Sequence, residues 1–138
     1  MSTAILWPLL AHITLVFALY AWLSLARVRA VQAGRVQYGC FEFGRDEPPD
    51  IARITRNLGN QFELPTIVYA AVLLLMQFGA LAAWDVAFCR VFFVGRVIHT
   101  GVQTLTDNVP LRGRVFVLNA LGCAGLIGHL ALVALRGA

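Results

Sequence analysis

The chain has 138 residues, of which 59% are hydrophobic and only 13% are charged, and its mean hydropathy is +0.75. A soluble domain carries about 25% charged residues, so this composition excludes an ordinary soluble domain and indicates an integral membrane protein. The net charge of +4 comes from arginines that lie beside apolar segments, without a basic face studded with aromatic residues, so we expect no nucleic-acid binding.

Four apolar segments follow one another along the chain, at about residues 5–26, 58–82, 84–105 and 111–135. Each has roughly the 20 residues that a helix needs to cross a bilayer. No basic residue precedes the first segment, and its apolar part is long, so we expect a permanent anchor and no cleavable signal. No linker or repeat separates the segments. The sequence therefore predicts one domain, residues 1–138, with an all-α fold: an integral membrane four-helix bundle.

The loops differ strongly in charge. The long first connection should be irregular in its middle, with the second helix starting near residue 51 and kinking at Pro65. This connection and the third loop hold eight arginines: Arg27, Arg29, Arg35, Arg45, Arg53, Arg56, Arg112 and Arg114. The opposite side has only Arg136. Arginine-rich loops stay in the cytoplasm, so we expect both termini outside and the first and third loops cytoplasmic.

Two polar stripes lie within the apolar segments. Arg56, Asn60 and Glu63 are spaced to share one face of the second helix. Arg96, His99 and Gln103 do the same on the third helix. The predicted topology brings these stripes to the cytoplasmic half of the membrane, where the helix ends add further arginines. Charged groups are costly in lipid, so we expect the stripes to face protein or water.

A cationic site with a single deep carboxylate suits an amphiphilic anion. Guanidinium groups bind carboxylates through paired hydrogen bonds, and Glu63 can receive an ammonium group. Glutathione carries two carboxylates, one amine and one thiol, and therefore matches this inventory. Gaps that face the lipid would admit an apolar second substrate from the bilayer.

Three motifs in order resemble the MAPEG family, the membrane-associated proteins of eicosanoid and glutathione metabolism. Residues 56–65 read Arg-Asn-Leu-Gly-Asn-Gln-Phe-Glu-Leu-Pro, residues 94–100 read Val-Gly-Arg-Val-Ile-His-Thr, and residues 110–112 read Pro-Leu-Arg. The likeness covers essentially the whole chain and is that of a bacterial-type member, which suggests the bacterial inner membrane. It implies a homotrimer of four-helix subunits, with glutathione bound between neighbouring subunits near the cytoplasmic face.

The resemblance also implies roles for individual residues. Arg112 would be the catalytic group that stabilises the glutathione thiolate. Glutathione-site or site-shaping residues would be Arg56, Asn60, Glu63 and His99, with Arg29 as a looser match. Arg96 joins this set through its place on the third-helix stripe. The expected function is a glutathione-dependent membrane transferase or peroxidase that activates the thiol toward hydrophobic electrophiles or lipid peroxides.

Other functions stay open because the chain departs from the family pattern. Gln103 stands where eicosanoid-making members usually carry a tyrosine, Gly113 where some carry a serine, and Phe116 where a later tyrosine occurs. One alternative is a non-catalytic trimer that binds lipid or another small amphiphile. Another is a small proton-coupled exporter that uses Glu63 as its proton site. Glu63 and Arg96 could also form a structural ion pair.

The cysteines and the remaining histidines carry weaker signals. Cys40, Cys89 and Cys123 form no C-x-x-C pair, so we expect neither a disulfide framework nor a metal site. His12 and His129 should lie at one depth in the outer half, where two histidines could ligate a haem. Polar packing between helices is the simpler interpretation of both.

Overall fold

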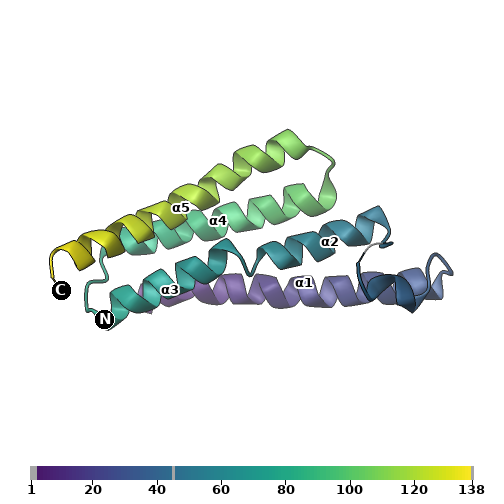
Figure 1. Ribbon diagram of the computed structural model, residues 1–138, viewed down its shortest axis with the longest axis horizontal. Helices are drawn as coiled ribbons and strands as arrows, with labels where there is room; N and C mark the ends of the chain where they lie inside the picture. Colours follow the sequence, from purple (N-terminus) through teal and green to yellow (C-terminus); the bar gives the residue numbers. More distant parts are fainter. Residues whose placement is uncertain (1–2, 45, 138) are drawn as a thin grey trace.

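The computed structural model describes residues 3–44 and 46–137, and every regular element in these ranges is helical. The long elements are α1 (Leu6–Gln32), α2 (Pro49–Asn60), α3 (Leu64–Gln77), α4 (Ala83–Leu105) and α5 (Val109–Leu135), with short 3-10 turns at Thr3–Ile5 and Tyr38–Phe41. α2 and α3 follow one another along the bundle, so the chain forms four rods (Figure 1). The all-α four-helix fold is confirmed. Arg45, counted above among the loop arginines, lies outside the described residues.

The two ends of the bundle hold different connections. The N- and C-terminal ends lie together with the turn between α3 and α4, whereas the first and third loops lie at the opposite end (Figure 1). We call this opposite end the loop end. Both termini therefore share one side of the bundle, as the sequence predicts. Which side is cytoplasmic stays a prediction from the arginine distribution.

The second span is broken, whereas the sequence suggested a kinked helix that continues to residue 82 or 83. α2 ends at Asn60, and Glu63 has φ −88° and ψ −97°, which is outside the helical region. Pro65 then occupies the first turn of α3, where its missing N–H would have no helical partner in any case. Proline therefore starts a new helix here.

α3 ends at Gln77, and the turn that follows contains Gly79 at φ +63°, a conformation that favours glycine.

In the described part of the chain, three stretches are long and apolar enough to cross a membrane: Thr3–Gln32, Pro49–Gln77 and Val109–Leu135. The fourth expected span, α4, has 23 residues and is about 35 Å long, which is sufficient length. Asp85, Arg90 and Arg96 make it less apolar than the others, and Asp85 and Arg96 are buried against neighbouring helices. α4 runs alongside α5 through the bundle (Figure 1), and its polar residues Arg96, His99 and Gln103 are buried.

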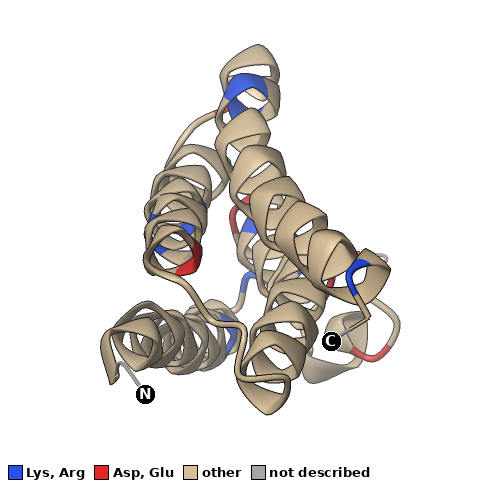
Figure 2. Cartoon of the chain, turned by 90° about the vertical axis from the view of Figure 1, so that its left-hand side faces the viewer, with Lys and Arg blue, Asp and Glu red and all other residues tan. Residues whose placement is uncertain are grey.

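The outer surface is largely apolar. Acidic and basic residues are sparse along the helices (Figure 2). Large hydrophobic side chains stand exposed on several helices, among them Trp7, Phe17, Leu73 and Leu121. Soluble monomers rarely expose continuous apolar patches of this kind, and a lipid bilayer is the environment that covers them. The chain is a membrane protein.

Two apolar clusters hold the bundle. One lies near the terminal end and is built around Val72, Leu75, Phe92 and Leu126, with Cys89 and Cys123 packed among them. The other joins α1 to α2 nearer the loop end, through residues such as Leu19, Leu23 and Ile54. α4 and α5 approach so closely that a Cβ on Gly122 would lie 2.9 Å from the Phe88 carbonyl oxygen. Besides these two clusters, the bundle contains buried polar residues, among them Asn57, Arg96 and Gln103, which connect α2 to α4.

Candidate functional site

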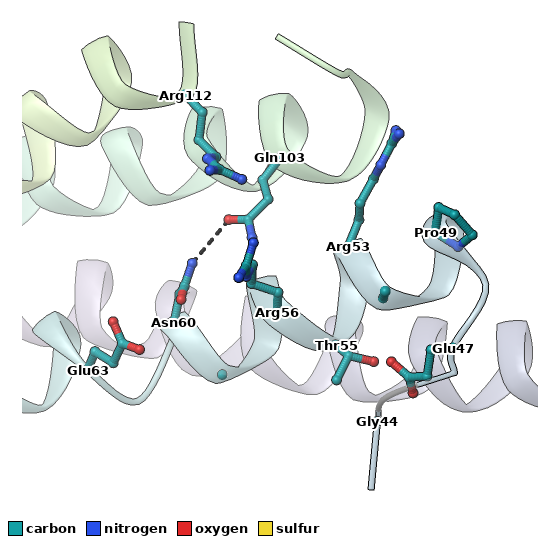
Figure 3. Close-up of a pocket in the computed structure, with 12 residues that line it drawn as sticks. Gly44, Glu47, Pro49, Arg53, Thr55, Arg56, Asn60, Glu63, Gln103 and Arg112 are labelled. Atoms are coloured by element: carbon teal, nitrogen blue, oxygen red, sulfur yellow. Dashed lines mark hydrogen bonds between the residues drawn. The ribbon is translucent and has the colours of Figure 1, made fainter. Parts of the chain in front are cut away.

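A cleft of about 670 Å³ opens at the loop end, between α2 and the adjoining parts of α4 and α5 (Figure 3). Most of its wall comes from α2 and the loop before it. The residues that line it are Gly44, Glu47, Pro49, Ala52, Arg53, Thr55, Arg56, Gly59, Asn60, Glu63, Gln103 and Arg112. Its volume lies within the range of about 300–1,000 Å³ that is usual for small-molecule sites.

Three charged side chains in the cleft are free to meet a ligand. Within the described ranges 3–44 and 46–137, the side chains of Arg56, Glu63 and Arg112 make no hydrogen bond or ion pair with another residue. In Figure 3 the guanidinium groups of Arg56 and Arg112 approach the cleft from different helices. Two cations and one carboxylate around a common space form a site for a ligand that carries both signs of charge.

Two further charged groups at the cleft already have partners. Arg53 forms an ion pair with Asp107, which joins α2 to the loop before α5. Glu47 forms an ion pair with Arg27 near the end of α1. The Glu47 carboxylate is almost completely buried, so this pair fixes the loop that closes one side of the cleft. The sequence did not predict Arg53 or Glu47 as site residues.

Gln103 connects the cleft to the interior of the bundle. Its Oε1 accepts a hydrogen bond of 3.1 Å from Asn60 Nδ2 and one of 3.2 Å from Asn57 Nδ2. The Asn60 contact is visible at the cleft wall (Figure 3). Gln103 Nε2 is buried and has no partner among the described residues. Two amides of α2 are thus held by one amide of α4, which fixes the wall against which a ligand lies.

Behind this wall, Gln61 is the centre of a buried hydrogen-bond network. Its Oε1 accepts from Arg96 Nε at 3.1 Å and bonds His12 Nε2 at 3.0 Å. Its Nε2 donates to Asn57 Oδ1 at 3.0 Å and to Thr100 Oγ1 at 3.3 Å. Gln61 lies at the break between α2 and α3, so the broken helix places one amide within reach of α1, α2 and α4.

The predicted site residues do not all reach the cleft. Arg56, Asn60, Glu63 and Arg112 line it together, from α2, the α2–α3 break and α5. Arg96 and His99 are buried in the bundle instead, with Arg96 only 1% exposed. Arg29 is exposed in the last turn of α1 and does not line the cleft. Four of the seven residues thus meet in one space.

Arg96 binds an amide where the sequence also allowed a carboxylate. Among the described residues it forms no ion pair with Glu63, which is exposed in the cleft. Arg96 Nε donates to Gln61 instead, and its Nη2 has no partner in the described part of the chain. His99 packs edge-on against Phe116 of α5, with ring centroids 6.3 Å apart. Both residues support the cleft from behind.

The two histidines weighed as haem ligands have protein partners. His12 bonds Tyr69 and Gln61 with its two ring nitrogens, at 2.8 and 3.0 Å. His129 Nδ1 lies 2.9 Å from a carboxylate oxygen of Asp85, near the terminal end of the bundle. These contacts accord with polar packing between helices.

Asn57, Gln61 and Thr100 were not predicted as part of the site. The signal was available in the sequence, because Asn57 and Gln61 are four residues apart, as are Arg96 and Thr100. Such spacing places each pair on one helix face, so the polar stripes extend further than the charged residues alone indicate. What could not be predicted is the break between α2 and α3, which leaves Glu63 outside both helices.

A scan against protein families finds a match to the MAPEG family over residues 9–132. Comparison with curated proteins and with solved structures finds no match. The matched residues include all five α-helices except for the ends of α1 and α5, and they include the whole cleft.

Proposed function

Because the chain belongs to the MAPEG family, we propose that it is a glutathione-dependent membrane transferase or peroxidase whose glutathione site is the loop-end cleft. Members of this family use glutathione. The observation that carries the proposal is the meeting of three unpaired charged side chains, Arg56, Glu63 and Arg112, in one cleft of about 670 Å³. Their charges are complementary to those of glutathione.

Each end of glutathione has a partner in this arrangement. Arg56 binds a carboxylate through the two parallel donors of its guanidinium group. Glu63 receives the α-ammonium group. Arg112 lies on α5, across the cleft from α2, and takes the thiol (Figure 3). Asn60 and Gln103 form the polar wall between these contacts.

Arg112 acts on the reactivity of the thiol. A guanidinium beside sulfur stabilises the thiolate over the neutral thiol and therefore lowers the thiol pKa from its free value of about 8.5. The thiolate is the nucleophile. In the transferase reaction, a carbon–sulfur bond forms while the electrophile's leaving group departs with its electron pair. In the peroxidase reaction, a sulfur–oxygen bond forms as the oxygen–oxygen bond breaks, which gives the sulfenic acid of glutathione and an alkoxide that takes a proton. A second glutathione thiol then displaces water from the sulfenic acid to form the disulfide.

The remaining predicted residues support the site from a distance. Arg96 holds Gln61, and through it Asn57, in position behind the cleft. His99 packs against Phe116 one turn beyond Arg112 on α5. Both are positioning residues in this proposal. Proteins of the family are generally trimers. We therefore propose a homotrimer in which Arg29, exposed at the end of α1, contributes to the site of a neighbouring subunit.

The orientation follows from the same proposal. The cleft opens at the loop end, which holds the arginine-rich first and third loops. With these loops in the cytoplasm, water-soluble glutathione reaches the cleft directly, while an apolar second substrate arrives from the bilayer. The bacterial inner membrane is the location that we propose.

Calorimetry and turnover measurements together test the function. Purified protein in lipid nanodiscs is titrated with glutathione and with an analogue in which a methyl group replaces the thiol. Turnover is followed with a chloronitrobenzene electrophile and with a lipid hydroperoxide. We expect saturable binding of both peptides and turnover with glutathione only. Binding without turnover would support the non-catalytic alternative, and no binding of either peptide would reject the glutathione site.

A further inference from the structure

A second cavity, of about 510 Å³, lies between α1 and the break that separates α2 from α3. We call it the lipid-side groove. Its lining residues are His12, Ile13, Val16, Phe17, Tyr20, Gln61, Phe62, Thr66 and Tyr69. It shares no lining residue with the loop-end cleft. The inference below therefore stands apart from the proposed glutathione site.

The walls of the groove are apolar and stand open on the surface of the chain. Phe17, Tyr20 and Phe62 are exposed, with Phe17 at 69%. All three lie within stretches that are long and apolar enough to cross a membrane. None of the nine lining residues is an Asp, Glu, Lys or Arg, and the one histidine, His12, is 3% exposed. A charged ligand would lose its hydration here without gaining a counter-charge, which is strongly unfavourable. The groove is therefore suited to a neutral molecule that enters from the lipid.

The floor of the groove is polar, and its hydrogen bonds fix where protons lie. Gln61 Oε1 can only accept, so the His12 Nε2 atom, 3.0 Å away, must carry the proton. His12 Nδ1 is then an acceptor, and the Tyr69 hydroxyl at 2.8 Å donates to it. His12 and Gln61 are 3% and 2% exposed, so water does not compete for these contacts.

This proton arrangement leaves acceptors but no free donor on the floor of the groove. The Tyr69 hydroxyl proton lies between His12 Nδ1 at 2.8 Å and, at a longer 3.4 Å, the Leu9 carbonyl oxygen, while the phenolic oxygen keeps a free lone pair. The Thr66 hydroxyl donates to the Phe62 carbonyl oxygen at 2.7 Å, so its oxygen is likewise an acceptor. A ligand gains a hydrogen bond from this floor only if it brings a proton of its own; the Tyr20 hydroxyl belongs to the wall.

We propose that the lipid-side groove binds a neutral, membrane-soluble molecule that carries a hydroxyl group, and that this hydroxyl donates to the Tyr69 oxygen. The apolar part of the molecule lies against Phe17, Tyr20 and Phe62. An ether or ester of the same size fits the walls equally well but has no proton for the floor. The site therefore distinguishes alcohols from their ethers, which a groove filled by lipid tails does not do.

Photolabelling with a matched pair of probes tests this. A long-chain alcohol that carries a diazirine and its O-methyl ether are each added to the purified full-length protein in nanodiscs, without glutathione. Mass spectrometry locates the adducts after irradiation. We expect the alcohol to label groove residues about fivefold more than the ether, the effect of one net hydrogen bond. Unlabelled alcohol should suppress this labelling.

Two tyrosine variants complete the test. Tyr69→Phe removes the acceptor oxygen and should abolish the preference for the alcohol. Tyr20→Phe is the matched control, because Tyr20 lines the same groove but only its ring makes a contact, with Phe62. It should keep the preference. Equal labelling by both probes, or a preference that survives Tyr69→Phe, would overturn the proposal. So would a groove that neither probe labels, as expected if a second copy of the chain covers it.

Discussion

The side-chain amide of Asn60 donates a hydrogen bond of 3.1 Å to Gln103 Oε1, which joins α2 to α4 at the wall of the cleft. The same oxygen accepts from Asn57, which is completely buried. One glutamine oxygen thus accepts from the amides of two asparagines. Its role in holding the wall does not require a hydroxyl group.

Gln103→Leu should destabilise the protein, because it leaves the buried Asn57 amide and the half-buried Asn60 amide without their acceptor. The expected loss is about 1–3 kcal/mol in the free energy of unfolding. Chemical unfolding in detergent, followed by circular dichroism, measures it. Gln77→Leu is the matched control, since Gln77 is exposed at the end of α3. Equal stability of the two variants would show that the Gln103 contacts do not hold the wall.

Two glycines of α5 should respond in opposite ways to alanine. A Cβ on Gly122 would lie 2.9 Å from backbone atoms of both Phe88 and Phe92, so Gly122→Ala must force α4 and α5 apart. A Cβ on Gly128 meets nothing within 4 Å, and alanine favours the helix by about 1 kcal/mol. Thermal unfolding should show a lower midpoint for Gly122→Ala and an unchanged or higher one for Gly128→Ala. The reverse order would contradict the close packing of these helices.

Asp85 should stabilise the end of the bundle where both chain termini lie. Its buried carboxylate accepts from the Ala82 N–H at 2.7 Å and lies against His129. Asp85→Ala removes both contacts and should cost about 3 kcal/mol in the free energy of unfolding. Asp46→Ala, in the exposed first loop, should change it by less than about 0.5 kcal/mol. Similar unfolding curves for both variants would remove the argument for a structural Asp85–His129 pair.

Arg56→Ala should weaken glutathione binding by about tenfold or more, since it removes a charged hydrogen-bonding partner from the cleft. Arg90→Ala is the control, because Arg90 is exposed on α4 outside the cleft. Calorimetric titration gives both dissociation constants. An Arg56→Ala protein that binds as tightly as the unchanged chain would place the carboxylate contact elsewhere.

The fold and much of the cleft follow from simple features of the sequence. Length and hydropathy predict the helices, and the order of four spans places the first and third loops at the same end, where the structure has them. The spacing of Arg56, Asn60 and Glu63 predicts a shared face, and all three line one cleft, although Glu63 lies beyond the end of α2. The helices and loops follow because they depend on local hydropathy and span order, which the sequence states directly.

The remainder depends on one backbone event. Pro65 was interpreted as a kink within a helix, whereas it lies in the first turn of a new one. The break leaves Glu63 exposed in the cleft, and Arg96 binds Gln61 at the end of α2. Whether a proline kinks a helix or restarts it depends on what the freed polar groups can reach in three dimensions, so the position of Glu63 could not be predicted from spacing alone.

Ultraviolet difference titration with glutathione near neutral pH tests the central proposal most directly, because it measures the thiolate that Arg112 is proposed to stabilise. We predict a saturable thiolate signal at a pH below the free thiol pKa of about 8.5. The signal should vanish in Arg112→Ala and persist in Arg114→Ala, whose exposed arginine lies two residues along α5 and outside the cleft. A full thiolate signal in Arg112→Ala would contradict the assignment of Arg112.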